Sequence, residues 1–341
     1  MEIFLAGLGL TAGRTRRVFN GISRPEVQSF AQMVDIKKEV QDLLNKHAFI
    51  SFLEAEVIEK STDGTIKFGF RLDDGLMIES VLIPSENRYT LCISSQVGCG
   101  MGCVFCLTAK MGFVRNLAIS EIVGQVMAVL NYMVSQGIER ATTREVINNL
   151  VFMGMGEPLA NYDNLLVALK ILMDERGLEF TERRVTVSTC GLTPKIAALG
   201  KDVRVNLAVS LHAADNQTRD LLMPVNKTYP LEGLLQACKE FPLTRKKVIL
   251  IEYILIKDIN DSVHDAQKLG RLLEGIPCRI NLLALNESSE LPYSCSDQEA
   301  TGRFRQALHD HGLLSFFRDS RGADISAACG QLVCAQKVIL E

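Results

Sequence analysis

The chain lacks long hydrophobic runs, an excess of charge of either sign, internal repeats and low-complexity segments. No apolar run in its 341 residues approaches the roughly 20 residues that a membrane-spanning helix needs, which argues against a membrane protein. The first residues lack the basic region of a signal peptide. A formal net charge of -3 gives no overall basic signature of nucleic-acid binding. These absences predict a cytoplasmic protein with no membrane partner.

A disulfide framework is also missing from the sequence. The 10 cysteines are irregularly spaced, and a chain of this length does not need disulfides for stability. They are typical of a protein in a reducing compartment. An apolar fraction of 47% is enough for a large core.

Three of the cysteines stand close together in a C-x3-C-x2-C pattern: Cys99, Cys103 and Cys106. Structural zinc needs four nitrogen or sulfur ligands, and no histidine lies nearby to complete such a set. A [4Fe-4S] cluster normally takes four thiolates, so three would leave one iron open to a small molecule. Glycines at 98, 100 and 102 favour a loop folded tightly round an object. The pattern indicates a cluster, with zinc and plain core packing as the alternatives.

The first 90 residues show two hydrophobic periods. Within residues 1–48, apolar residues recur at helical spacing from Met33 to Leu44, which predicts a small helical domain. Within residues 49–90 the period is two, with Asp-Gly turns near 63 and 74. This second pattern predicts an antiparallel β extension whose strands are 50–58, 66–72 and 76–83.

From residue 91 to residue 341 strands and helices alternate, which calls for a parallel sheet. About six such units favour an α/β fold of the partial (β/α)6 barrel type over a closed eight-stranded barrel. Ser120 is the expected N-cap of the first helix, with Glu121 in its opening turn. The predicted strands are 148–153, 184–188, 203–210, 247–254, 279–284 and 314–318. The predicted helices are 120–136, 161–175, 193–200, 230–241, 261–274 and 297–310.

Several polar residues fall at or just beyond the ends of predicted strands. In parallel α/β folds, ligands bind at the C-terminal ends of the strands. Each residue alone is more often an ordinary loop or core residue, but their joint placement favours a ligand site. The set comprises Gly156, Glu157, Ser188, Ser210, Leu211, His212 and Asn286.

Four motifs in order resemble the radical S-adenosylmethionine (SAM) adenine methyltransferases of RNA. They are SSQVGC ending at Cys99, FMGMGEPL at 152–159, VSLH ending at His212 and AACGQL around Cys329. Phe105 supplies the aromatic residue that precedes the last cysteine in the superfamily signature. The resemblance covers about residues 79 to 332. It implies a radical SAM barrel with a small N-terminal RNA-docking domain.

The resemblance also implies cofactors and roles. Cys99, Cys103 and Cys106 would hold a [4Fe-4S] cluster whose open iron binds SAM, and one electron would cleave SAM to methionine and a 5'-deoxyadenosyl radical. The seven strand-end residues above would contact SAM. Cys329 would accept a methyl group from a first SAM and, after a second SAM is cleaved, join to the adenine. Cys92 would release the product through a transient disulfide, and Glu79 would accept a proton. Without the resemblance, Cys92 and Cys329 suggest core residues and Glu79 a solvent-facing strand residue.

The implied substrates are adenine 2503 of 23S rRNA, free of proteins or in an early assembly intermediate, and adenine 37 of tRNA, both at C2. An electron donor such as flavodoxin and a monomeric state are also expected. Methylation at C8, a radical SAM reaction on a non-RNA substrate, and a ribosome-associated factor with a structural metal are the alternatives. No role is predicted for Cys190 or Cys334.

Overall fold

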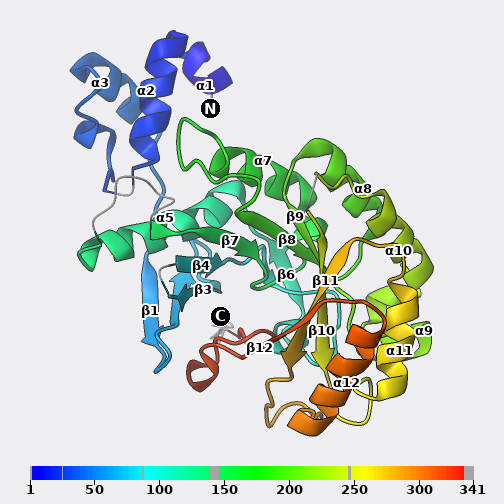
Figure 1. Ribbon diagram of the computed structural model, residues 1–341. Helices are drawn as coiled ribbons and strands as arrows, with labels where there is room; N and C mark the ends of the chain where they lie inside the picture. Colours follow the sequence, from blue (N-terminus) through cyan, green and yellow to red (C-terminus); the bar gives the residue numbers. More distant parts are fainter. Residues whose placement is uncertain (1, 25, 87, 139–145, 245–246, 334–341) are drawn as a thin grey trace.

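The computed structural model describes residues 2–24, 26–86, 88–138, 146–244 and 247–333 (Figure 1). Cys334 lies outside these residues. No helix in the described part of the chain is long and apolar enough to cross a membrane.

The first elements are the helices α1 (Glu2–Gly7), α2 (Ala12–Ile22), η1 (Phe30–Gln32) and α3 (Lys38–His47). They have a hydrophobic core of their own, which includes Leu5, Val18, Phe30, Met33 and Leu44. Met33 and Ile36 belong to this core but precede α3, so the helical spacing continues through a turn before the helix begins. Figure 1 shows these helices beside α5, outside the large sheet.

The next strands form the antiparallel part of a ten-stranded sheet. They are β1 (Ala55–Lys60), β2 (Ile66–Arg71), β3 (Met77–Ser85) and β4 (Arg88–Cys92). Turns at 62–64 and 73–75 connect the first three strands, as predicted. The first strand starts at Ala55, not at residue 50, so this boundary was wrong.

The rest of the sheet is parallel and continues from β4 through β7 (Asn149–Phe152), β8 (Val185–Thr189), β9 (Asn206–Ser210), β10 (Ile249–Leu255), β11 (Cys278–Ala284) and β12 (Ser315–Arg318). The connecting helices are α5 (Ile119–Ser135), α7 (Tyr162–Leu172), α8 (Thr193–Asp202), α10 (Leu231–Glu240), α11 (Val263–Leu272) and α12 (Gln298–Asp310). The two edges of the sheet, β1 and β12, do not pair with each other. The predicted partial (β/α)6 barrel is therefore confirmed.

The helix α5 begins one residue earlier than predicted, so Ser120 is not its N-cap. Ala118 precedes the helix, and the Glu121 side chain accepts a hydrogen bond from the Ala118 N–H at 2.7 Å. Glu121 also accepts two hydrogen bonds from Arg115 at 2.8 Å. A carboxylate in the first turn satisfies free backbone donors and interacts favourably with the helix dipole, which makes a serine cap unnecessary.

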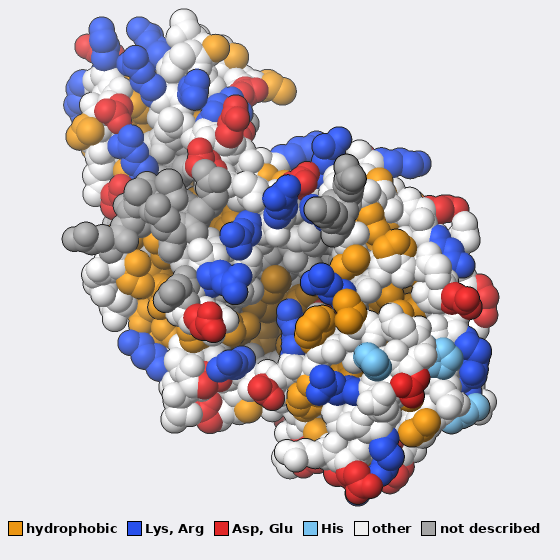
Figure 2. All heavy atoms as spheres, in the orientation of Figure 1, with side chains coloured by type: hydrophobic (Ala, Val, Ile, Leu, Met, Phe, Trp, Pro, Cys, Tyr) orange, Lys and Arg blue, Asp and Glu red, His pale blue; other side chains and the backbone are white. Residues whose placement is uncertain are grey.

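The two faces of the parallel strands differ in polarity. Residues such as Val187, Leu207 and Tyr253 belong to the main core beneath the helices. The alternate positions carry polar groups: Ser210, Glu252 and Asn281 lie in one row across β9, β10 and β11. A polar inner face cannot be filled like a hydrophobic core, so it provides space for ligands. Figure 2 shows the molecule hollowed near its centre, with Lys and Arg side chains around the rim.

Candidate active site

The three motif cysteines lie on the loop that joins β5 (Gln96–Gly98) to the short helix α4 (Leu107–Lys110). Gly98 has φ +70°, and a Cβ there would lie 1.8 Å from the carbonyl oxygen of Gly112. The Cys99 N–H donates to that same oxygen at 2.9 Å. The start of the loop is thus fixed against β6 (Phe113–Asn116), and only glycine fits at residue 98.

The cysteine loop fits a [4Fe-4S] cluster better than plain core packing. Cys99, Cys103 and Cys106 are all partly exposed. Burial, with smaller contributions from Cys106 and Glu157, raises the pKa of Cys99 to about 12. Burial also raises the pKa of Cys103, and the thiols of Cys106 and Cys99 add to the effect. Iron would displace the thiol protons on binding.

Single-metal binding requires a tighter group of ligands than the structure contains. In a tetrahedral zinc site with Zn–S distances of about 2.3 Å, sulfur atoms are about 3.8 Å apart. Within the described part of the chain, no three His, Cys, Asp or Glu side chains are grouped so that they hold one metal ion. A [4Fe-4S] cube needs a wider triangle of thiolates, because each thiolate binds a different iron.

Gly156 and Glu157 follow β7 and are held against β5. Gly156 has φ +94°, and a Cβ there would lie 2.5 Å from Cβ of Gln96. The Gln96 side chain accepts a hydrogen bond from the Glu157 N–H at 2.9 Å. The Glu157 carboxylate accepts from the N–H groups of Leu159 at 2.9 Å and Cys190 at 2.8 Å. Burial raises the pKa of Glu157, and these hydrogen bonds oppose the rise.

His212 follows β9 and is neutral and fixed in orientation. Its Nδ1 accepts a hydrogen bond from the Ile254 N–H at 3.0 Å, so the proton is on Nε2. Burial lowers the pKa of His212 to about 3, and the charge of Arg219 adds to this effect. Its ring packs edge-to-face on Phe105 at 5.0 Å, which links the strand end to the cysteine loop. Its one remaining donor, Nε2–H, is available to a ligand.

The other predicted strand-end residues lie on β8, on or just beyond β9, and beyond β11. Ser188 is buried within β8, and Ser210 ends β9 and is partly exposed. Leu211 is fully buried, so only its backbone could contact a ligand. Its N–H already donates to the carbonyl of Glu252, and its carbonyl already accepts a hydrogen bond from Arg219. Asn286 lies beyond β11.

The loop that carries Cys329 is anchored at both ends. Asn286 donates to the carbonyl oxygen of Cys329 at 3.0 Å. The Leu107 N–H donates to the carbonyl of Gly330 at 2.8 Å, next to the cysteine loop. At the other end of the loop, Asp324 accepts a hydrogen bond from Ser61 at 2.6 Å. These contacts hold the Cys329 loop against the cysteine loop at one end and against the turn at 62–64 at the other.

Cys92 and Cys329 approach each other from distant parts of the sequence. Cys92 ends β4 and is buried. Burial raises its thiol pKa, and the nearby Cys329 thiol raises it further. Cys329 is exposed to solvent. The protein atoms around its thiol nevertheless raise the pKa of that thiol, and the negative charge of Glu252 adds to this effect. All described cysteines are unpaired.

Glu79 lies on the inner face of β3, in contrast to the solvent-facing position that its sequence context alone suggested. It is 5% exposed, and among the described residues its Oε2 has no hydrogen-bond partner. Burial raises the pKa of Glu79, whereas Lys67, whose Nζ lies 3.5 Å from Oε1, lowers it. A carboxylate with an unpartnered oxygen and a raised pKa is suited to proton transfer.

Comparison with known proteins identifies the family. Residues 93–269 match the radical SAM superfamily. A radical SAM methyltransferase from Sphaerobacter thermophilus has a similar structure, with a TM-score of 0.89, 39% identity and coverage of 97% of this chain and 96% of that one. The dual-specificity RNA methyltransferase RlmN of Desulfotalea psychrophila is 48% identical over 96% of this chain and 91% of its own. The RlmN of Geobacter sulfurreducens is 49% identical over 97% and 89%.

The chain belongs to the RlmN family of radical SAM methyltransferases. Membership implies a [4Fe-4S] cluster and SAM as cofactors. The polar inner face of the barrel and the three partly exposed thiols are consistent with both. The resemblance predicted from the four motifs is thereby confirmed.

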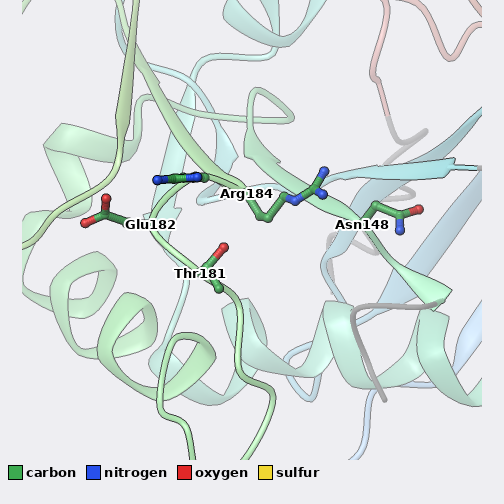
Figure 3. Close-up of a pocket in the computed structure, with 5 residues that line it drawn as sticks. Asn148, Thr181, Glu182 and Arg184 are labelled. Carbon is green, nitrogen blue, oxygen red and sulfur yellow. The ribbon is translucent and has the colours of Figure 1, made fainter. Parts of the chain in front are cut away.

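A separate cavity lies at the opposite ends of the strands. Figure 3 shows it, lined by Asn148, Thr181, Glu182, Arg183 and Arg184. These residues precede β7 and β8, whereas the RlmN-family motif residues Glu157 and His212 follow β7 and β9. The cavity is therefore not the active site.

Two buried charged residues near the site, Glu252 and Arg219, were not predicted from the sequence. Glu252 accepts a hydrogen bond from Asn281 at 2.7 Å on the inner face of the barrel. It is the one charged residue in the apolar run of β10, Ile249–Leu255, and this signal was available. Arg219 is fully buried on α9 (Asn216–Leu222), a helix too short for hydrophobic periodicity to show.

Proposed function

We propose that the chain methylates C2 of an adenine in RNA, in 23S rRNA at adenine 2503 and in tRNA at adenine 37, with two SAM molecules consumed per methyl group transferred. The proposal rests chiefly on family membership and on the position of Cys329 beside the cysteine loop, where the Leu107 N–H donates to the carbonyl of the next residue, Gly330, at 2.8 Å. C2 lies between two ring nitrogens and is electron-poor, so it does not attack the methyl group of SAM directly. A cysteine that carries the methyl group and a second cysteine that removes it provide another route.

Cys99, Cys103 and Cys106 would hold the cluster, and the SAM site would adjoin Gly156, Glu157, Ser188, Ser210, Leu211, His212 and Asn286. When bound, the cluster supplies the electron that cleaves SAM. His212 offers Nε2–H as a hydrogen-bond donor. The side chain of Asn286 orients the Cys329 loop, because it donates to the Cys329 carbonyl.

The 5'-deoxyadenosyl radical would take a hydrogen atom from the methyl group on Cys329, and the resulting carbon radical would add to C2 of the adenine. Loss of one electron, which would return to the cluster, and of the C2 proton would leave Cys329 covalently joined to the base through that carbon. Cys92 would then attack the sulfur of Cys329. The S–S bond forms as the S–C bond breaks, and the electron pair of that bond passes to the carbon, which takes up a proton as the new methyl group. An external thiol would later reduce the transient disulfide.

Glu79 would accept the proton that leaves C2, and its role predicts a specific defect. In Glu79→Gln, release of the RNA should slow by about 100-fold or more, as is typical for loss of a general base. The covalent RNA–protein adduct should accumulate and be visible on a denaturing gel. Because burial raises the pKa of Glu79 above that of a free glutamate, the rate of wild-type release should rise with pH as the carboxylate forms, at higher pH than for a free glutamate, and the variant should lose this dependence.

A matched control exists for this prediction. Glu59 also pairs with Lys67, at 2.8 Å, but its side chain is 44% exposed. Glu59→Gln should release RNA at the wild-type rate. Equal adduct levels in wild type and Glu79→Gln would remove Glu79 from the mechanism.

RNA as substrate is supported by the names of the relatives, which are dual-specificity RNA methyltransferases. The Lys and Arg side chains around the central hollow in Figure 2 suit a phosphate backbone. A cytoplasmic location, a monomeric state and an electron donor such as flavodoxin belong to the same proposal.

The deciding experiment is product analysis. Anaerobically reconstituted protein, SAM and reductant are incubated with a 23S rRNA fragment or with tRNA, and the digested nucleosides are identified by mass spectrometry. We expect 2-methyladenosine from both RNAs. 8-Methyladenosine would establish the C8 alternative, and unmodified RNA with continued SAM cleavage would favour a non-RNA substrate.

A further inference from the structure

Arg219 is a buried cation without a carboxylate partner in the described chain. It is 0% exposed. Its guanidinium donates to the carbonyl oxygens of Leu211 at 3.0 Å, Cys190 at 2.6 Å and Ser210 at 3.2 Å, and to the Asn226 side chain at 2.9 Å. No described Asp or Glu forms an ion pair with it. These hydrogen bonds satisfy its donors, but they do not neutralise its charge, and a buried uncompensated charge is costly.

The helix that carries Arg219 packs against the cysteine loop. The Leu222 carbonyl, at the end of α9, accepts a hydrogen bond from the Val104 N–H at 3.1 Å. Leu222 and Cys103 lie in the same hydrophobic cluster. The positive charge therefore lies behind the cysteine loop.

A buried anion on the other side of Cys190 mirrors this arrangement. Glu157 is also without a cationic partner among the described residues, and it accepts a hydrogen bond from the Cys190 N–H at 2.8 Å. The carbonyl of the same residue accepts from Arg219 at 2.6 Å. The backbone of Cys190 thus lies between the Arg219 guanidinium and the Glu157 carboxylate, and the two side chains form no ion pair with each other.

We propose that Arg219 is a positioning residue that supplies the counter-charge to the cluster and raises its reduction potential. This inference rests on the proposed assignment of Cys99, Cys103 and Cys106 as ligands. A [4Fe-4S] core held by three thiolates carries net negative charge, which grows by one electron on reduction. A fixed cation in a poorly solvated position stabilises the reduced form more than the oxidised form.

The test is a reduction potential measured by EPR-monitored titration of the anaerobically reconstituted protein. In Arg219→Met, the potential should fall by the equivalent of at least a tenfold change in the reduction equilibrium, about 59 mV for one electron. Arg219→Lys, which loses the guanidinium hydrogen bonds but keeps the charge, should remain within about threefold of wild type. The distant Arg176→Met, which removes an equal charge, should leave the potential unchanged.

Asp220→Asn provides an independent variant that preserves the fold. Asp220 accepts a hydrogen bond from Asn226 at 2.6 Å, which asparagine can also accept. Its negative charge acts on Arg219, so its removal should shift the potential upward, opposite to Arg219→Met. If Arg219→Met does not fold, Arg219→Gln, which keeps hydrogen-bond donors for the same carbonyl groups but has no charge, replaces it and should show the same fall in potential.

The outcomes separate the inference from the proposed function. Wild-type protein that folds but binds no iron would refute the ligand assignment. Loaded variants that lose thermal stability but keep the wild-type potential would show that Arg219 has a structural role only, and the inference would be overturned.

Discussion

Cys329→Ala is expected to lose RNA methylation by more than about a thousandfold while it continues to cleave SAM. The loss is this large because the methyl group has no carrier without the thiol, and removal of a covalent nucleophile leaves little residual rate. SAM cleavage continues because the three motif cysteines are unchanged. RNA methylation and SAM cleavage are measured on one sample, the first as methylated nucleoside and the second as 5'-deoxyadenosine.

Cys278→Ala is the matched control for this prediction. Cys278 is partly buried and starts β11, at the opposite end of the strands from the site. The control should methylate RNA at the wild-type rate. Methylation by Cys329→Ala above one-tenth of that rate would show that the methyl group travels by another route.

Cys103→Ser should lose both the cluster and SAM cleavage. Serine is a harder and weaker ligand for iron than a thiolate, and two cysteines cannot hold a cube whose fourth iron must stay open. Iron and sulfide per chain should fall to background, and 5'-deoxyadenosine production should drop by more than about a thousandfold. The readouts are iron analysis and product quantification after anaerobic reconstitution.

Cys295→Ser controls for the general effect of removing a thiol. Cys295 is partly exposed and lies in a β-bridge with Ile256, outside the motif loop. It should keep full iron content. Wild-type iron content in Cys103→Ser would mean that other ligands hold the metal, and zinc in place of iron in the wild type would favour a structural site.

The barrel was predictable because its strands and helices alternate with distinct hydrophobic patterns. The strand predicted at 184–188 lies at Val185–Thr189, and the helix predicted at 297–310 lies at Gln298–Asp310. Short elements were missed, since α9 and the β5–β6 hairpin contain too few residues for a period to emerge. The predicted N-cap of α5 was wrong because the Glu121 carboxylate, and not Ser120, accepts the backbone hydrogen bond at the start of the helix.

The site was only partly predictable from the residues. The spacing of Cys99, Cys103 and Cys106 indicated a cluster on its own, because all three fall within one loop. The pairing of Cys92 with Cys329 came only from the family resemblance, since it depends on a contact across more than two-thirds of the chain. Arg219 gave no signal at all, because its environment is made of carbonyl groups whose positions depend on the fold.

Mass spectrometry of Cys329 in anaerobically purified protein tests the central claim most directly. The peptide that contains Cys329 should carry one added methyl group, either as purified or after incubation with SAM and reductant on an intact cluster, and Cys92 should remain unmodified. An unmodified Cys329 under those conditions would contradict the account and leave a radical SAM enzyme that does not use this cysteine as a methyl carrier.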